Sequence, residues 1–153
     1  MSKGFSLIEL VIVLVIVAIL VSVAIPAYKS YSQKIRVEEE THKVFLALKD
    51  MQLKAKTQKM VFCADLTDGG RSLTIYKDTD CTSKEKDISL QVTFALKNPS
   101  YKLRVNKFGI FTSKNSIYAV NGEGASVNCV KTDSFRICEG VWDGTAKKCN
   151  CKF

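Results

Sequence analysis

The feature that most constrains this chain is a nearly uninterrupted apolar run of 21 residues from Phe5 to Ile25, in which only Ser6, Glu9 and Ser22 are polar. At about 1.5 Å of rise per residue, a helix of this length reaches roughly 30 Å, which is the thickness of a bilayer core. Because every face of the helix is apolar, it must lie in lipid or against other copies of itself. We therefore expect a membrane-length helical segment over residues 5–27.

Glu9 is the unusual residue of this segment. A carboxylate near the start of a membrane helix is costly to bury, so we expect it to have a cationic partner. The apolar run contains no basic residue, and Lys3 is the only one close to it on the amino-terminal side. If the chain is cut after Gly4, Lys3 is lost and the new α-ammonium group of Phe5 becomes the nearest cation. It could pair with Glu9 in the same subunit, four residues away, or in a neighbouring subunit.

A short basic leader ends with Gly4 and is followed by the aromatic residue Phe5. Glu9 lies four positions after Phe5, so that residues 4–10 read GFSLIEL. This pattern resembles the class III signal sequence of type IV pilins and type II secretion pseudopilins. The resemblance covers Met1 to about Tyr31 and implies that a prepilin peptidase removes residues 1–4 and N-methylates Phe5. It also implies that Glu9 guides assembly and that Pro26 bends the helix. The sequence contains none of the enzyme motifs G-x-x-x-x-G-K, H-E-x-x-H and G-x-S-x-G, so we expect neither enzymatic activity nor a cofactor.

Two other interpretations of the same segment are less favourable. An ordinary secretory signal peptide would have small residues in an A-x-A arrangement near Ala24 or Ala27, and such a site is missing. A simple membrane anchor would have no need of a carboxylate at position 9. The pattern favours a filament subunit over both.

The helix is expected to continue beyond the membrane segment as far as about Lys59. Residues 28–59 contain neither glycine nor proline, and apolar side chains recur there every three or four positions. This stripe consists of Val37, Thr41, Val44, Leu48, Met51 and Ala55. Charges occupy the other faces, Glu40 among them, so this half should be amphipathic and pack on its own globular domain. His42 lies among these charges and is expected to be a solvated surface residue.

Residues 60–153 should form a β-rich head. Short stretches of alternating or β-branched residues are separated by turn signals such as Asn98-Pro99 and Asn121-Gly122. The expected strands are 72–76, 88–94, 101–105, 109–112, 116–120, 126–130 and 135–138. Five to seven strands without a second long helix predict an α+β fold, in which one antiparallel sheet covers the stripe on the helix.

The head contains six cysteines, and an even number in an exported domain indicates disulfides. They are Cys63, Cys81, Cys129, Cys138, Cys149 and Cys151. Zinc binding is less favoured because the usual paired C-x-x-C spacing is absent. Cys129 and Cys138 flank an expected hairpin turn and could face each other, whereas Cys149 and Cys151 are poor partners for one another. The resemblance to pilins implies a disulfide that closes the carboxyl-terminal loop, from Cys138 to Cys149 or Cys151. Cys63–Cys81 would then be a separate bridge.

The formal charge is +8, and it becomes +7 if Lys3 is removed, since 22 basic and 15 acidic residues remain. A basic surface favours polyanions such as DNA, although a lysine-rich soluble surface is an equally simple explanation. Residues 108–140 distantly resemble the H-type minor pseudopilins and the FimT-like minor pilins, in which a Gly-Arg-x-Arg sequence contacts DNA. Only Arg136 matches that sequence here, in Phe135-Arg136-Ile137-Cys138.

Three functions are compatible with these features. The first is a pilin or minor pilin of a type IV pilus, and the second is a pseudopilin of a secretion system. The third is a DNA-binding subunit at a filament tip. Each implies prepilin peptidase, related subunits and the inner membrane as partners, followed by an extracellular or periplasmic filament. The cysteines and the basic charge favour the pilus.

Overall fold

The structure is a computed structural model, and it describes residues 6–152. Its first element is the helix α1, Leu7–Gln58, which confirms the long helix expected from the sequence. Pro26 lies inside α1. Because proline has no backbone N–H, the helix lacks one hydrogen bond at this point. Close to it, the Ser22 hydroxyl donates to the Ile19 carbonyl oxygen at 2.7 Å. The bend at Pro26 stays a prediction.

The chain divides into two compact units between Gln33 and Lys34, within α1. In the described part of the first unit, every residue from Ser6 to Tyr31 is exposed. This part contains a helical window that is long and apolar enough to cross a membrane. Nothing in the described part of this unit covers this apolar surface, and an exposed apolar surface of this extent favours an apolar environment.

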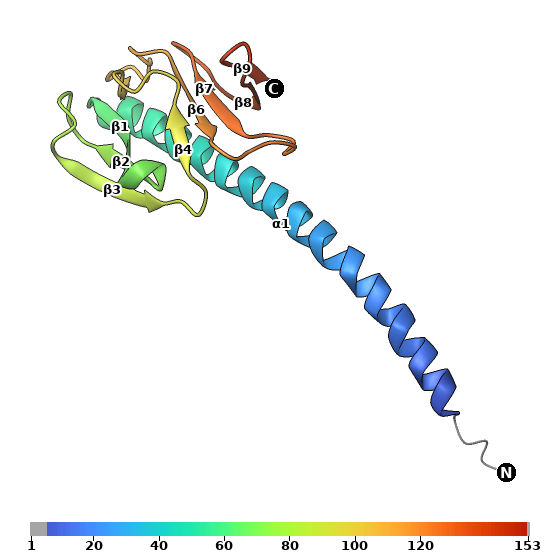
Figure 1. The fold of residues 1–153 in the computed structure, drawn as a ribbon. Helices are drawn as coiled ribbons and strands as arrows, with labels where there is room; N and C mark the ends of the chain where they lie inside the picture. The colour runs from blue at the N-terminus through green and yellow to red at the C-terminus, as the bar shows by residue number, and fades with distance from the viewer. Residues whose placement is uncertain (1–5, 153) are drawn as a thin grey trace. The chain divides into compact units, whose positions relative to one another are not determined.

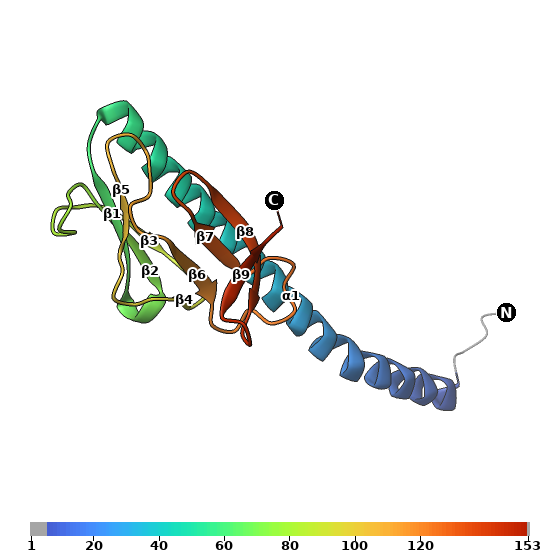
Figure 2. The ribbon, with the colours of Figure 1, turned by 90° about the horizontal axis from the view of Figure 1, so that it is seen from above.

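The second unit combines residues 34–58 of α1 with two antiparallel sheets (Figures 1 and 2). The first sheet has the order β3-β2-β1-β5 and the second has the order β4-β6-β7-β8-β9. The strands are β1 (Phe62–Thr67), β2 (Ser72–Tyr76), β3 (Lys84–Ser89), β4 (Phe94–Leu96), β5 (Leu103–Val105), β6 (Asn115–Ala119), β7 (Cys129–Thr132), β8 (Ile137–Asp143) and β9 (Lys148–Cys151). A short 3-10 helix, Asp68–Gly70, connects β1 to β2. The expectation of one sheet with five to seven strands was therefore wrong in detail, while the α+β class is confirmed.

The clearest strand error concerns residues 88–94, which the sequence pattern joined into one strand. Instead β3 ends at Ser89 and β4 begins at Phe94, so the chain passes from one sheet to the other. The Leu90 N–H donates to the Arg71 carbonyl oxygen at 2.8 Å, and the Gln91 N–H donates to a Glu40 carboxylate oxygen at 3.1 Å. These two hydrogen bonds take the place of strand pairing at residues 90 and 91. The segment between β3 and β4 therefore alternates polar and apolar residues although it is not a strand.

Other differences lie at the strand ends. Residues 109–112 form no strand, and only an isolated bridge joins Phe111 to Val105. The expected strand 135–138 begins later, because the Asp133 N–H donates to the Arg136 carbonyl oxygen and closes a turn there. β1 and β9 were not expected at all. β9 has the sequence KCNC, in which only the two cysteines are apolar, and this run is too short for periodicity to indicate a strand.

The core forms where the helix meets the sheets. All six residues of the predicted stripe are buried, together with side chains from both sheets such as Phe62, Phe94 and Ile117. Glu40 was expected on a solvated face but is 7 % exposed. Its carboxylate accepts from the Gln91 N–H and lies 3.5 Å from the Lys43 ammonium, so a buried charge is compensated.

Candidate functional site: apolar helix segment, disulfides and basic cavity

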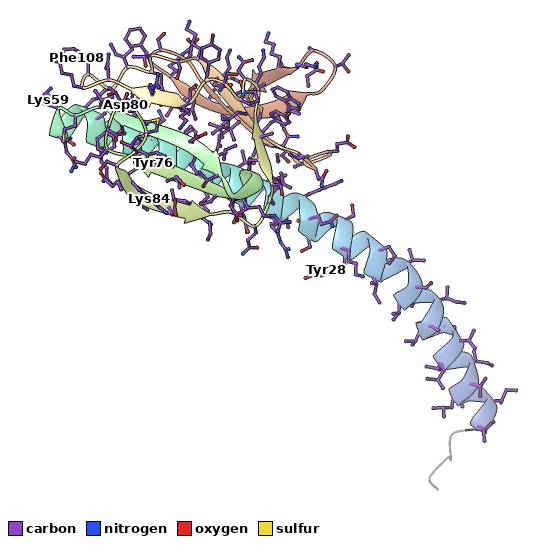
Figure 3. All side chains as sticks on the ribbon, turned by 60° about the vertical axis from the view of Figure 1, so that its left-hand side comes forward. Tyr28, Lys59, Tyr76, Asp80, Lys84 and Phe108 are labelled. Carbon is purple, nitrogen blue, oxygen red and sulfur yellow. A yellow bond between two sulfur atoms is a disulfide. The ribbon has the colours of Figure 1, made fainter. Side chains whose placement is uncertain are left out.

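The apolar segment, residues 7–25, projects its side chains from all sides of the helix (Figure 3). Glu9 is exposed in the first turn of α1. No lysine, arginine or histidine lies between it and Lys29 in the sequence. The processing residues Gly4 and Phe5 lie outside the described residues. The pairing of Glu9 with the Phe5 ammonium thus stays a prediction. Among the described residues, Glu9 is the one carboxylate of the apolar segment, and this segment contains no basic residue.

The six cysteines form three disulfides, Cys63–Cys81, Cys129–Cys149 and Cys138–Cys151. Cys63–Cys81 joins β1 to the loop after β2, with the Cα atoms 5.5 Å apart, as the sequence analysis expected. All six cysteine sulfurs are engaged in disulfides, whereas zinc binds cysteine as a free thiolate.

The suggestion that Cys129 faces Cys138 was wrong. In the β7–β8 ladder Cys129 is opposite Gly140, and Cys138 is opposite Lys131. The unexpected strand β9 then pairs with β8. This pairing brings Cys149 close to Cys129 and Cys151 close to Cys138. Cys138–Cys151 agrees with one of the two pairings that the pilin resemblance implied. Gly140 permits this arrangement, because a Cβ there would collide with the Asn150 carbonyl oxygen.

Arg136 lies in the turn between β7 and β8 and lines a cavity of about 410 Å³. Three lysines from different elements line the same cavity: Lys49 of α1, Lys131 of β7 and Lys152 after β9. The remaining lining residues are Asp133, Ile137, Cys138 and Cys151. We call this group of eight residues the basic cavity. Sequence analysis found only Arg136, because the three lysines are remote in sequence and share no motif.

Among the described residues that line the basic cavity, Asp133 supplies the one carboxylate, and it is already engaged. It accepts from the Lys114 ammonium at 2.9 Å and from the Ser134 N–H at 2.8 Å. These two donors, Lys114 first, hold the pKa of the Asp133 carboxyl below its usual range. The carboxylate is therefore ionised, but Lys114 offsets its charge. The four cations that line the cavity leave it with a clear excess of positive charge.

A row of side chains on α1 continues from this cavity. The Lys49 ammonium lies 5.6 Å from the centre of the Phe45 ring, and the His42 ring stacks on Phe45 with the centroids 5.9 Å apart. His42 Nδ1 lies 2.8 Å from a Glu139 carboxylate oxygen of β8. His42 is half exposed as expected, yet it also joins the helix to the second sheet, which its place in the sequence did not indicate.

Comparison with known proteins gives a consistent result. Residues 1–25 match the family described as "Prokaryotic N-terminal methylation motif". A fimbrial protein of Neisseria meningitidis is 28 % identical over 120 residues, which are 74 % of this chain and 68 % of the relative. The type IV major fimbrial protein FimA of Dichelobacter nodosus is 43 % identical over 65 residues, 40 % of this chain and 42 % of FimA. The type IV major pilin PilE1 of Neisseria gonorrhoeae is 54 % identical over 39 residues, 26 % of this chain and 24 % of PilE1. This chain thus spans less than half the length of the latter two relatives.

Two solved structures share the fold. The type IV minor pilin FimU of Pseudomonas aeruginosa superposes with a TM-score of 0.59 at 11 % identity, over 72 % of this chain and 92 % of FimU. The minor pseudopilin EpsH of the Vibrio cholerae type 2 secretion system gives 0.53 at 15 % identity, over 68 % of this chain and 95 % of EpsH. The findings agree with one another: residues 1–25 carry the methylation motif, fimbrial proteins and type IV pilins align with the chain, and its fold is that of FimU and EpsH.

Proposed function

We propose that this chain is a pilin or minor pilin of a type IV pilus, and that it assembles through its amino-terminal helix. The observation that carries the proposal is the apolar segment 7–25, which is exposed throughout and carries one carboxylate near its start. Burying such a segment is strongly favourable, at roughly 25 cal/mol per Å² of apolar surface, but nothing in the described part of its unit buries it. Lipid can do so before assembly, and the same segments of other subunits can do so afterwards.

Processing follows from the same segment. A prepilin peptidase would remove residues 1–4 and methylate Phe5, which leaves 5–27 as the membrane and filament-core helix, 28–59 as its amphipathic continuation and 60–153 as the head. The single apolar segment would hold the subunit in the inner membrane, with the head on the outer side. Disulfides persist in oxidising compartments, and the three bridges of the head support its export.

The fold alone does not separate a pilus from a secretion pseudopilus, because it matches both FimU and EpsH. The relatives compared above are fimbrial proteins and a type IV pilin, and the alignment with the Neisseria meningitidis protein covers 120 residues and so reaches into the head. An alignment of this length with a fimbrial protein favours a pilus subunit. A pseudopilin is the second candidate, and it would have the same processing and the same helix.

Sheared surface filaments test the proposal directly. Electron microscopy should show filaments that an antibody against the head labels, and mass spectrometry of the filaments should find this chain. Its intact mass should correspond to a chain that begins at Phe5, carries one additional methyl group and lacks six thiol hydrogens. A subunit that begins at Met1 or near Ala24 would contradict the processing. A processed subunit that stays in the cell envelope, with no surface filament, would favour the pseudopilin.

Polyanion binding is a second candidate function, since the basic cavity places Arg136 with three lysines. DNA bound there should dissociate as salt rises, because each neutralised phosphate releases counterions. Arg136→Ala should lower the affinity and the salt dependence, while Lys86→Ala, on β3 and outside the cavity, should leave the salt dependence nearly unchanged. Equal effects of the two variants would show that DNA binding depends on the net charge of the chain and not on the basic cavity.

A further inference from the structure

We propose that Cys138–Cys151 is an exchangeable disulfide and that the basic cavity admits an anionic low-molecular-weight thiol to it. Cys151 would then be reversibly S-thiolated by this small thiol. The proposal does not depend on the filament function, because it concerns only the head. It rests on three observations: the different exposure of the three disulfides, the charges around this one, and the size of the cavity.

Exposure separates the three disulfides. Cys63, Cys129 and Cys149 are at most 2 % exposed, and Cys81 is 7 % exposed. Cys151 is exposed at the end of β9, and Cys138 is half-buried. A thiolate must approach a sulfur from outside to exchange with it. In the described part of the chain, Cys151 is therefore the cysteine most accessible to attack.

The charges around the disulfide favour both steps of such an exchange. Lys49, Lys131, Arg136 and Lys152 line the cavity together with both cysteines. Their positive potential concentrates an anionic attacking thiol and stabilises the thiolate that leaves. Among the described residues, two carboxylates are near. That of Asp133 is paired with Lys114, and that of Glu139, next to Cys138 in sequence, lies 2.8 Å from His42 Nδ1, which offsets its charge only when the imidazole is protonated.

The cavity can hold a small thiol. Its volume of about 410 Å³ falls within the range of ligand pockets, roughly 300–1,000 Å³. A tripeptide thiol with two carboxylates, such as glutathione, has the charge that the four cations select. A cationic thiol of smaller size, such as cysteamine, enters the same space but meets repulsion.

The reaction is balanced without any further oxidant or reductant. The thiolate of the small molecule attacks the Cys151 sulfur, a new sulfur–sulfur bond forms there, and the Cys138–Cys151 bond breaks. The electron pair of that bond stays on the Cys138 sulfur, which leaves as a thiolate among the cations. The reverse attack of the Cys138 thiolate on the mixed disulfide restores the original bond and releases the small thiol.

Opening this bond leaves the head folded. β9 remains paired with β8 from Gly140–Cys151 to Asp143–Lys148, and Cys129–Cys149 still joins it to β7. Cys63–Cys81 joins β1 of the other sheet to the loop after β2. The change is therefore confined to the end of the chain and the mouth of the basic cavity, so the bond can open and close repeatedly.

The test uses the full chain in detergent and two probes, glutathione and cysteamine. After each reaction time, free thiols are alkylated, and mass spectrometry identifies which cysteines were opened and which carry the probe. Rates are divided by the concentration of each probe's thiolate. We expect Cys138–Cys151 to open first with both probes, with the glutathione adduct on Cys151. We also expect glutathione to react at least about tenfold faster per thiolate than cysteamine.

Charge variants show whether the cavity is responsible. The triple variant Lys49→Gln, Arg136→Gln and Lys152→Gln should bring the ratio of the two rates close to one. A control triple variant, Lys77→Gln, Lys86→Gln and Lys97→Gln, removes the same charge from outside the cavity and should keep the ratio near that of the wild type. The proposal is overturned if the wild-type ratio is near one, if both triple variants lower it equally, or if another disulfide opens first.

Discussion

The side-chain nitrogen of Gln52 donates a hydrogen bond of 2.8 Å to the carbonyl oxygen of Gly109, 57 residues away. Gln52 lies on the buried side of α1, and Gly109 lies in the loop between β5 and β6 with a positive φ of 75°. The methylene groups of Lys56 cover Gly109 where a side chain would otherwise project. The same nitrogen lies 3.4 Å from the Phe135 carbonyl oxygen. One amide of the helix thus holds two loops of the head.

Replacing Gln52 by leucine should destabilise the head. The substitution keeps the volume roughly constant but leaves the buried Gly109 carbonyl without its donor, which costs about 1–3 kcal/mol. The free energy of unfolding of the full chain in detergent, measured with urea, should fall by that amount. Gln58→Leu, at the exposed end of the same helix, is the matched control and should change it by less than about 0.5 kcal/mol. Equal stability of the two variants would contradict the role of Gln52.

The helix illustrates what sequence could and could not predict. The recurrence of apolar residues from Val37 to Ala55 correctly identified the buried stripe, because burial on a helix follows a period of 3.6 residues. The same argument assigned Glu40 to solvent, although it is buried. Its partner, the Gln91 N–H, comes from a segment 51 residues away, and no local pattern indicates such a bond.

The disulfides should differ in their contribution to stability. Removing a disulfide typically costs about 2–5 kcal/mol. We expect the double variant Cys129→Ser/Cys149→Ser to lie at the upper end, since it also leaves two hydroxyl groups at positions that are 0 % and 2 % exposed. The double variant Cys138→Ser/Cys151→Ser should lie at the lower end, because Cys151 is exposed. Urea unfolding measures both.

Alanine versions of the same double variants provide the control. Alanine introduces no buried hydroxyl, so the difference between the two bridges should shrink when alanine replaces serine. If the serine and alanine versions at Cys129 and Cys149 are equally stable, burial does not account for the difference. If Cys138→Ser/Cys151→Ser is the less stable pair, the expected order is wrong.

The basic cavity shows where sequence reasoning reached its limit. Arg136 was found through a resemblance, but Lys49, Lys131 and Lys152 come from α1, β7 and the residue after β9. β9 has only two apolar residues, both cysteines, and forms a strand by pairing with β8. Tertiary pairing and not local preference defines this part of the fold, so the cavity could not be predicted without the structure.

Asp133 should titrate at a lower pH than an ordinary aspartate. Lys114 and the Ser134 N–H hold its pKa below its usual range, about 3.9 in model peptides. Its contribution to stability is therefore present above that ordinary value and is lost as the pH falls through the lower folded-state pKa. Carboxyl NMR titration of the wild type and of Lys114→Ala should show the Asp133 midpoint rising in the variant. Lys97→Ala, which does not contact Asp133, should leave the midpoint in place.

The last prediction concerns Glu9 and the assembly of the filament. An ionised carboxylate buried without a partner costs several kcal/mol, whereas the Phe5 ammonium of a neighbouring subunit would compensate it in an apolar filament core. Glu9→Gln keeps the shape and removes the charge. We expect normal cleavage and membrane insertion, but at least about tenfold less incorporation into filaments, because the Phe5 ammonium of the neighbour then loses its partner. Quantitative mass spectrometry of membranes and sheared filaments, from cells that also express the wild type, measures the ratio.

Two further variants separate charge from polarity. Glu9→Leu makes the helix more lipid-soluble, so any loss of incorporation cannot come from poor insertion, and we expect it to match Glu9→Gln. Ser22→Leu also replaces a polar residue of the segment, but the Ser22 hydroxyl is already bonded to the Ile19 carbonyl oxygen within its own helix. It should therefore incorporate like the wild type. Normal incorporation of both Glu9 variants would show that the segment assembles through its apolar surface alone, since a pair of charges cannot set the register once one charge is gone.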